Sequence, residues 1–214
     1  MRIGIDTGGT FTDFVWLDEA RTRLGIAVGD VSGKAMKSAM TAVMTDGMLY
    51  LEAGETRSIS EILQRVNRSI FRKTDKQMFT ALCLASLDVV SRELTYTNAG
   101  LNEPLLKSNG SVLFLKSVGT KLPLGLVQDA EYEETNTLLE PAAVLVFFTD
   151  GIPESQNHAR EQYGEERLRT LLARMDTAAM SAHEIKESII TDVKRFSGLS
   201  HQRDDMTIVV VKVS

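Results

Sequence analysis

Short runs of apolar residues end at aspartates at two places in the chain. Residues 24–29 are small and apolar and stop at Asp30, and residues 142–149 are almost wholly apolar and stop at Asp150. Apolar runs of this length, bounded by turn residues, are typical of buried strands. The pattern therefore predicts two buried strands, each with a carboxylate at its end.

A third run of this kind lies near the end of the sequence. Residues 206–213 are β-branched and apolar, and the run begins directly after Asp204 and Asp205. If the three strands share one sheet system, their aspartates can meet at one rim. Taken one at a time, such aspartates are ordinary helix caps or turn residues, so the repetition is what favours a shared site.

Apolar residues at steps of three and four predict four helices around these strands. The first helix carries an apolar stripe that we expect to face the core and that Gly54 ends; the stripe consists of Met36, Ala39, Met40, Val43, Met44 and Leu51. Capping-box spacing at Ser58 and Glu61 starts a second helix. The third covers 165–175, and the fourth covers 181–196 behind a second capping box.

Between the two helix pairs, the chain consists of short β-rich runs within residues 79–139. Asn109-Gly110 separates two of them and is a hairpin signal, because both residues accept positive φ. The order of elements predicts an α+β fold with two packed, mainly antiparallel sheets and helices outside them. Without a linker, repeat or low-complexity tract, we expect a single domain over residues 1–214.

Composition excludes several classes of function. The net charge of −5 and the pI of about 5.3 offer no basic surface for nucleic acid or an anionic membrane. Cys83 is the only cysteine, which rules out an intrachain disulfide and a thiolate zinc site. No apolar stretch approaches the roughly 18 to 20 residues that span a bilayer. We expect a cytoplasmic protein, and self-association as a homodimer stays open.

Carboxylates crowded at the edge of a core repel one another and are costly to desolvate. Hard divalent cations relieve this cost, since magnesium and manganese prefer oxygen ligands. None of the aspartate motifs contains histidine, which argues against zinc. Cations of this kind lower the pKa of bound water and support hydrolysis of phosphate esters. The sequence therefore predicts a metal-dependent hydrolase.

Five motifs also resemble a known family, the SpoIIE-type bacterial phosphatases of the metal-dependent type 2C superfamily. They are GDVSGK (29–34), LTYTNAG (94–100), LPLGL (122–126), FFTDGIPES (147–155) and RDDMTIVVV (203–211). The resemblance implies an α-β-β-α sandwich, two manganese or magnesium ions, and a phosphoserine or phosphothreonine protein as substrate. In this family the substrate is often an antagonist of an anti-sigma factor.

The resemblance also implies roles for individual residues. Asp30 would bridge the two metal ions, Asp150 and Asp204 would bind one of them, and the carbonyl of Val31 would contribute to the other. Asp205 would contact the metal ligands rather than the metal ions. Most members of the family act without a covalent intermediate, so no nucleophilic side chain is expected.

One ligand position departs from the family pattern. Where the family has Gly-Gly-Asp, the chain has Gly8, Gly9 and Thr10. A neutral hydroxyl binds a hard cation more weakly than a carboxylate does. Asp13 is the candidate replacement, although a shift of three residues along a strand reverses the face of the side chain. An alternative function is therefore a degenerate phosphatase that binds a phosphoprotein without efficient turnover.

The start of the chain carries a different resemblance. The string MRIGIDTGGTFTDF (1–14) is similar to the phosphate-binding opening of the hydantoinase/oxoprolinase group of actin-like ATPases. This resemblance implies ATP binding as a third function. We expect instead that residues 1–13 are an atypical or truncated start of the phosphatase domain, from a fused or misassigned start or a replaced leader. The backbone groups of the edge strand would then be exposed, or Arg2 to Asp6 would pair with them.

Overall fold

The computed structural model describes residues 2–7, 14–17, 22–33, 36–56, 58–74, 78–198 and 205–213. Contacts between its elements divide the chain into two units. The first unit comprises Met1–Gly9, Asn102–Lys116 and Leu139–Ser214, and the second comprises Thr10–Leu101 and Ser117–Leu138.

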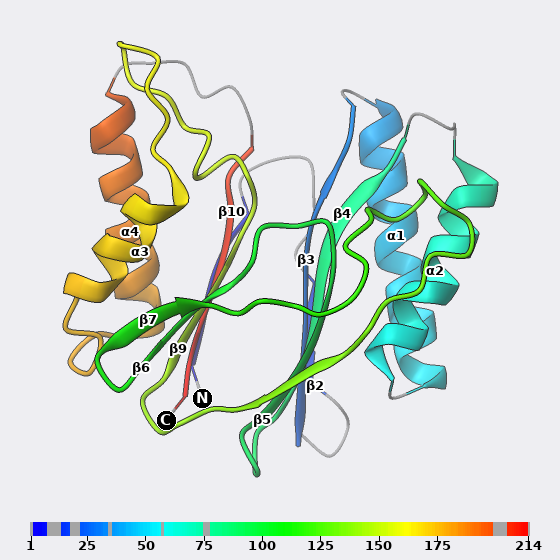
Figure 1. Cartoon of the computed structure of the whole chain (residues 1–214), viewed down its shortest axis with the longest axis horizontal. Helices are drawn as coiled ribbons and strands as arrows, with labels where there is room; N and C mark the ends of the chain where they lie inside the picture. The colour runs from blue at the N-terminus through cyan, green and yellow to red at the C-terminus, as the bar shows by residue number, and fades with distance from the viewer. Residues whose placement is uncertain are drawn as a thin grey trace. The chain divides into compact units, whose positions relative to one another are not determined.

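The second unit is a five-stranded antiparallel sheet with two helices on one face (Figure 1). In sheet order its strands are β2 (Phe14–Leu17), β3 (Arg23–Val31), β4 (Thr80–Asp88), β5 (Glu93–Ala99) and β8 (Thr135–Leu138). The helices are α1 (Met36–Glu55) and α2 (Ile59–Lys73). Apolar residues of α2 and of the middle strands form one buried core.

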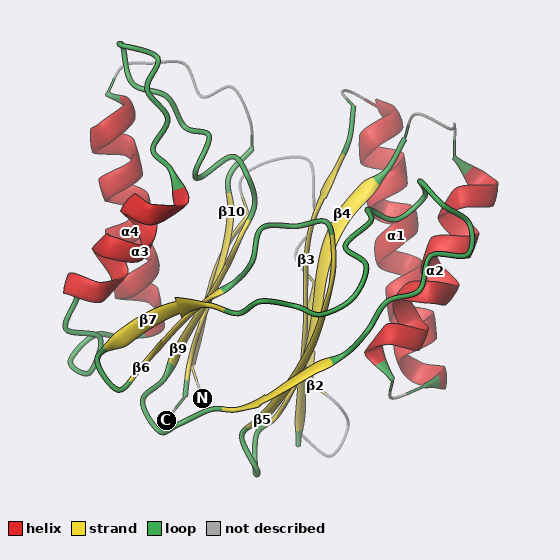
Figure 2. Ribbon diagram, in the orientation of Figure 1, coloured by secondary structure: helices red, strands yellow, loops and turns green. Residues whose placement is uncertain are grey.

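The first unit repeats this plan (Figure 2). Its strands are, in sheet order, β1 (Arg2–Thr7), β10 (Thr207–Lys212), β9 (Val144–Phe148), β6 (Leu105–Ser108) and β7 (Ser111–Phe114). Helices α3 (Glu165–Arg174) and α4 (Ala182–Ser197) pack on it around a second buried core. Strand β1 pairs with β10 at the edge, so of the two alternatives for Arg2 to Asp6 the structure has the paired one.

Local sequence signals account for several of these boundaries. Asn109 and Gly110 have φ values of 50° and 78° and form the turn between β6 and β7, as predicted. The capping box of Ser181 and Glu184 is present at the start of α4. Gly198 has a φ of 59° and ends that helix by donating its N–H to the carbonyl of Lys194. These elements are specified by residues close to them in the sequence.

For the first helix, the prediction of which face is buried is wrong. Met36, Met40, Val43 and Leu51, which we expected in the core, are between 66% and 75% exposed. Ala39 is exposed as well, and Met44 is only partly buried against the core. The helix also runs through Gly54 to Glu55 rather than ending at the glycine.

Small and polar residues instead form most of the buried face of α1. Its buried residues are Ser38, Thr41, Ala42, Thr45 and Leu49. Short side chains let a helix lie close to its neighbours, and the hydroxyl of Thr45 is satisfied by the carbonyl of Thr41 at 2.8 Å. Helix α1 therefore buries its small and polar face, against the orientation that the hydrophobic pattern predicts. No helix within the described ranges has the length and apolar character needed to cross a membrane.

The indole of Trp16 lies directly over Gly25 on the neighbouring strand. The two residues are register partners in β2 and β3. A Cβ atom at Gly25 would stand 2.1 Å from the ring of Trp16. Glycine is therefore required at this position for the ring to cover the strand.

The start of α2 is held by a carboxylate from elsewhere in the second unit. Glu134 Oε1 accepts hydrogen bonds from the hydroxyl of Ser58 (2.8 Å) and from the N–H and hydroxyl of Ser60 (3.0 Å each). Burial by itself raises the pKa of Glu134, but these hydrogen bonds outweigh it and lower the pKa below its ordinary value of 4.5.

We expect Glu134 to stabilise the fold at neutral pH and to lose that effect in acid. Because its pKa is lower in the folded than in the unfolded protein, its contribution is complete above about pH 4.5 and falls as pH drops through the folded pKa. Urea unfolding of Glu134→Gln should show a loss of about 1 to 2 kcal/mol at pH 7. The difference from the wild type should shrink as the pH falls below 4.5; a constant difference would contradict the assignment.

Candidate functional site

Asp30 emerges at the end of a buried central strand of the second unit. Residues 24–29 are buried, whereas Asp30 is half-buried and Val31 is buried again. Pairing with β4 places Asp30 opposite Ala81 and Val31 opposite Thr80. The carboxylate therefore stands at the rim of its sheet, where the strand leaves the core.

The loop that follows Asp30 is fastened by Ser32. The N–H of Ser32 donates to the carbonyl of Phe79 at 2.9 Å, and the N–H of Phe79 donates to the hydroxyl of Ser32 at 2.8 Å. The carbonyl of Ser32 accepts from the hydroxyl of Ser38 on α1 at 3.3 Å. These bonds hold the backbone around Val31 in one position, which a carbonyl ligand requires.

Asp150 lies in a matching position in the first unit. Strand β9 is buried throughout, and the next residue, Thr149, ties it to the start of β10. The hydroxyl of Thr149 accepts from the N–H of Thr207 at 3.0 Å and donates to the carbonyl of Asp205 at 3.4 Å. The register thus brings Asp150 and Asp205 to the same end of one sheet.

Gly151 allows the two chain segments to meet. A Cβ atom at this residue would lie 2.1 Å from the backbone oxygen of Asp205. The turn is closed by the N–H of Glu154, which donates to the carbonyl of Asp150 at 2.8 Å. The hydroxyl of Ser155 donates to the carbonyl of Gly151 at 2.7 Å. Any other residue at 151 would separate the strand ends that carry the aspartates.

The structure describes the positions of three of the predicted metal ligands. Asp30, Val31 and Asp150 stand at strand ends as expected. Asp204, Asp13 and Thr10 lie outside the described residues. Within the part of the chain that the structure describes, no three histidine, cysteine, aspartate or glutamate residues cluster as a metal site. Asp30 belongs to the second unit and Asp150 to the first, so their convergence stays a prediction.

The donors at both strand ends fit a hard divalent cation. Each rim offers carboxylate and backbone carbonyl oxygens, with neither a thiolate nor an imidazole in the motifs. Oxygen donors of this type select magnesium or manganese over softer metals. The types of donor atom at each rim are therefore compatible with the predicted ions.

Two positioning residues were missed by the sequence analysis. Ser32 and Thr149 lie inside the motifs GDVSGK and FFTDGIPES, beside the aspartates. Their proximity to Asp30 and Asp150 was visible. Their hydrogen-bond partners, Phe79 and Thr207, are 47 and 58 residues away. No local sequence pattern predicts hydrogen bonds over such separations.

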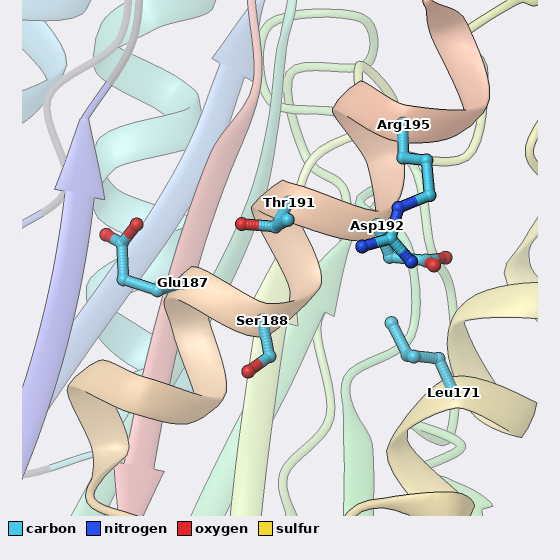
Figure 3. Close-up of a pocket in the computed structure, with 6 residues that line it drawn as sticks. All are labelled: Leu171, Glu187, Ser188, Thr191, Asp192 and Arg195. Atoms are coloured by element: carbon cyan, nitrogen blue, oxygen red, sulfur yellow. The ribbon is translucent and has the colours of Figure 1, made fainter.

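A pocket of about 310 Å³ lies elsewhere, between α3 and α4 of the first unit (Figure 3). It is lined by Leu171, Glu187, Ser188, Thr191, Asp192 and Arg195. Asp192 already accepts a hydrogen bond from the hydroxyl of Tyr163 at 2.8 Å. The pocket contains none of the predicted metal ligands and is separate from the candidate site.

Comparison with known proteins identifies the family. The family described as Stage II sporulation protein E (SpoIIE) matches residues 20–214 of the chain. The chain belongs to the SpoIIE family. The match includes all five quoted motifs, whereas residues 1–19 lie outside it. A curated relative, the phosphoserine phosphatase RsbU of Bacillus subtilis, is 23% identical over 202 residues, which cover 94% of this chain.

The SpoIIE-family chain is shorter than its curated relatives. It spans 58% of the length of RsbU and 33% of another relative. Among solved structures, the SiaA-PP2C domain of Pseudomonas aeruginosa matches with a TM-score of 0.84, 21% identity and coverage of 99% of this chain and 86% of the other. RsbX in complex with magnesium matches with a TM-score of 0.71, 15% identity and coverage of 99% and 94%. The fold is thus the α+β fold of type 2C phosphatases, as predicted.

The contact at Gly151 leads to a test of how the rim is built. We expect Gly151→Ala to lower the free energy of unfolding by about 1 to 3 kcal/mol, because the added methyl group meets the backbone of Asp205. Thermal unfolding measures the loss. Gly54→Ala is the matched control: a Cβ there meets nothing within 4 Å in α1, and alanine favours a helix. Equal effects of the two substitutions would contradict the close approach.

Proposed function

We propose that this SpoIIE-family chain hydrolyses phosphoserine or phosphothreonine on a regulatory protein, with manganese or magnesium as its cofactor. The family match over residues 20–214 carries the proposal. It is supported by the relative RsbU, whose name is phosphoserine phosphatase, and by the magnesium complex of RsbX. An antagonist of an anti-sigma factor is the kind of substrate that the family resemblance favours.

In this proposal Asp30, Val31, Asp150 and Asp204 would hold the metal ions, and Asp30 would contribute to both. When bound, such ions supply Lewis acidity and a water of lowered pKa at the phosphate. The chain itself holds the ligands in position. Ser32 and Thr149 fix the backbone beside Asp30 and Asp150, so the carboxylates need no rearrangement when charge develops on the phosphate oxygens.

The position of the remaining ligand differs from the family pattern. Thr10 occupies it, and Asp13 is the candidate that restores a carboxylate. With Thr10 at this position one of the two ions would be held more weakly, and hydrolysis remains the function that we propose. We place it in the cytoplasm, which the single, reduced and buried Cys83 supports.

We further propose that the chain forms a homodimer through α1. The exposed stripe of Met36, Met40, Val43 and Leu51 runs along this helix and is too apolar for an ordinary solvated face. Gly47 lies within the stripe and has open space over its Cβ position, so a second helix can approach closely there. A second α1 offers the same apolar stripe in return, as a two-fold interface requires.

Substitution of the aspartates tests the proposed activity. We expect manganese-dependent release of p-nitrophenol from p-nitrophenyl phosphate by the wild-type chain. Asp30→Asn and Asp150→Asn should each reduce kcat by about 100-fold or more, because each removes a charge that holds the metal. Asp129→Asn, at an exposed aspartate paired with Arg68 at 3.6 Å, is the control and should retain activity.

Thr10→Asp separates the active from the degenerate phosphatase. A wild-type chain without turnover at saturating manganese, restored by Thr10→Asp, would replace the proposed function by phosphoprotein binding. Wild-type turnover that Asp30→Asn leaves unchanged would refute the metal site itself.

Charged substitutions on α1 test the dimer. We expect Met40→Glu with Val43→Glu to convert a dimer into a monomer in sedimentation velocity, since like charges would face each other across the interface. Leu113→Glu changes an exposed leucine in β7 of the first unit and should leave the mass unchanged. A monomeric wild type, or a dimer that survives both substitutions on α1, would exclude this interface.

A further inference from the structure

The hydroxyl of Ser155 contacts two chain segments that carry predicted metal ligands of the first unit. It donates a hydrogen bond to the carbonyl of Gly151 at 2.7 Å. It also lies 3.6 Å from the sulfur of Met206, and a thioether sulfur is a weak acceptor. Gly151 follows Asp150, and Met206 comes two positions after Asp204. One side chain therefore connects the turn after β9 with the residues that lead into β10.

The contacts of Ser155 complete those of Thr149. The hydroxyl of Thr149 bonds to the carbonyl of Asp205 and to the N–H of Thr207. Ser155 contacts Met206, the residue between these two. Three consecutive residues before and at the start of β10 are thus held by two hydroxyl groups from the segment that follows β9.

The backbone of Ser155 is fixed without its hydroxyl group. Its N–H donates to the carbonyl of Ile152 at 3.3 Å, and its carbonyl accepts from the N–H of Tyr163 at 2.8 Å. Tyr163 is 3% exposed, and its hydroxyl donates to Asp192 of α4 at 2.8 Å. Its ring packs edge-on against Phe196 of the same helix, with ring centroids 5.5 Å apart. Removal of the Ser155 hydroxyl should therefore leave the loop folded.

Loss of the hydroxyl would instead act on the turn that carries Asp150. Gly151 is buried, and a buried carbonyl that loses its donor either stays unsatisfied at a cost or shifts toward another partner. A shift of Gly151 displaces the residue before it, Asp150. Metal ligands have to be held within about 0.5 Å of their productive geometry, so the ion is sensitive to such a displacement.

We propose that Ser155 is a positioning residue for the metal ion that Asp150 and Asp204 would hold. It acts by fixing the two ligand-bearing segments against each other, through the carbonyl of Gly151 and the sulfur of Met206. This inference rests on the proposed function, because it takes the two aspartates as metal ligands. Replacement of a residue that orients metal ligands typically weakens metal binding by roughly 10- to 100-fold.

The affinity for manganese tests this role without turnover. Isothermal titration calorimetry of the wild-type chain and of Ser155→Ala gives the Kd of each manganese ion. We expect Ser155→Ala to weaken the binding of one ion about tenfold.

Hydrolysis of p-nitrophenyl phosphate supplies a second readout. In Ser155→Ala, the manganese concentration that gives half-maximal activity should rise about tenfold. The kcat at saturating manganese should stay within about threefold of the wild-type value, because the ligands themselves are intact. A general loss of folded protein would lower the rate at every manganese concentration.

Ser188→Ala is the matched control. The hydroxyl of Ser188 also donates to a carbonyl four residues earlier, that of Glu184, at 2.7 Å. This bond lies within α4, so its loss changes neither segment that carries a predicted ligand. The Kd for manganese should stay within about twofold of the wild-type value.

Met206→Leu removes the other contact of the Ser155 hydroxyl. Leucine keeps nearly the volume of methionine but accepts no hydrogen bond, and we expect the same ion to bind about two- to threefold more weakly. If circular dichroism shows that Ser155→Ala does not fold, this variant carries the test by itself.

An unchanged Kd in Ser155→Ala or in Met206→Leu would overturn the proposal, as would an equal loss in Ser188→Ala. A fall in kcat that saturating manganese does not restore would assign Ser155 to the fold alone and would overturn it too. A wild-type chain that binds no manganese would refute the proposed function, and this inference with it. Wild-type binding and turnover with an unchanged Kd in Ser155→Ala would refute the inference only.

Discussion

The register of antiparallel strands is the constraint on which both halves of the candidate site depend. Side chains alternate along a strand, so a slip of one residue moves every side chain to the opposite face. Because β3 is buried on both faces, such a slip would draw Asp30 into the buried part of the strand or push an apolar residue out beyond its end. Cooperative burial of β3 and β9 excludes it, and the bonds of Ser32 and Thr149 secure the strand ends. The hydrophobic cores therefore determine where the carboxylates emerge, although no carboxylate belongs to a core.

Much of the fold could be predicted from the sequence because its signals are local. A hairpin needs two residues with positive φ, and a capping box needs two side chains three positions apart. Asn109-Gly110 and Ser181 with Glu184 satisfy these conditions, and the structure confirms both. The positions of Asp30 and Asp150 at strand ends follow equally from apolar runs that stop. The family resemblance added the ligand roles, which no pattern within the chain specifies.

The remaining features depend on partners far away in the sequence. The apolar stripe of α1 indicated a buried face, but the helix buries Ser38, Thr41 and Thr45 instead. The periodicity of apolar residues shows that a helix has an apolar and a polar face. It does not show which of the two faces packs against the neighbouring elements. Asn67 is a similar case. No pattern in α2 predicts that Asn67 is buried and bonds to a loop 60 residues later. A buried polar side chain is hydrogen-bonded, and its partners are known only once the structure is known.

The contact between Trp16 and Gly25 has a practical consequence. Trp16 is the only tryptophan in the chain, and its ring lies against the backbone of β3, the strand that ends at Asp30. Excitation at the red edge of protein absorbance therefore reports on the second unit alone. Trp16 is therefore an intrinsic fluorescent probe of the pairing of β2 with β3.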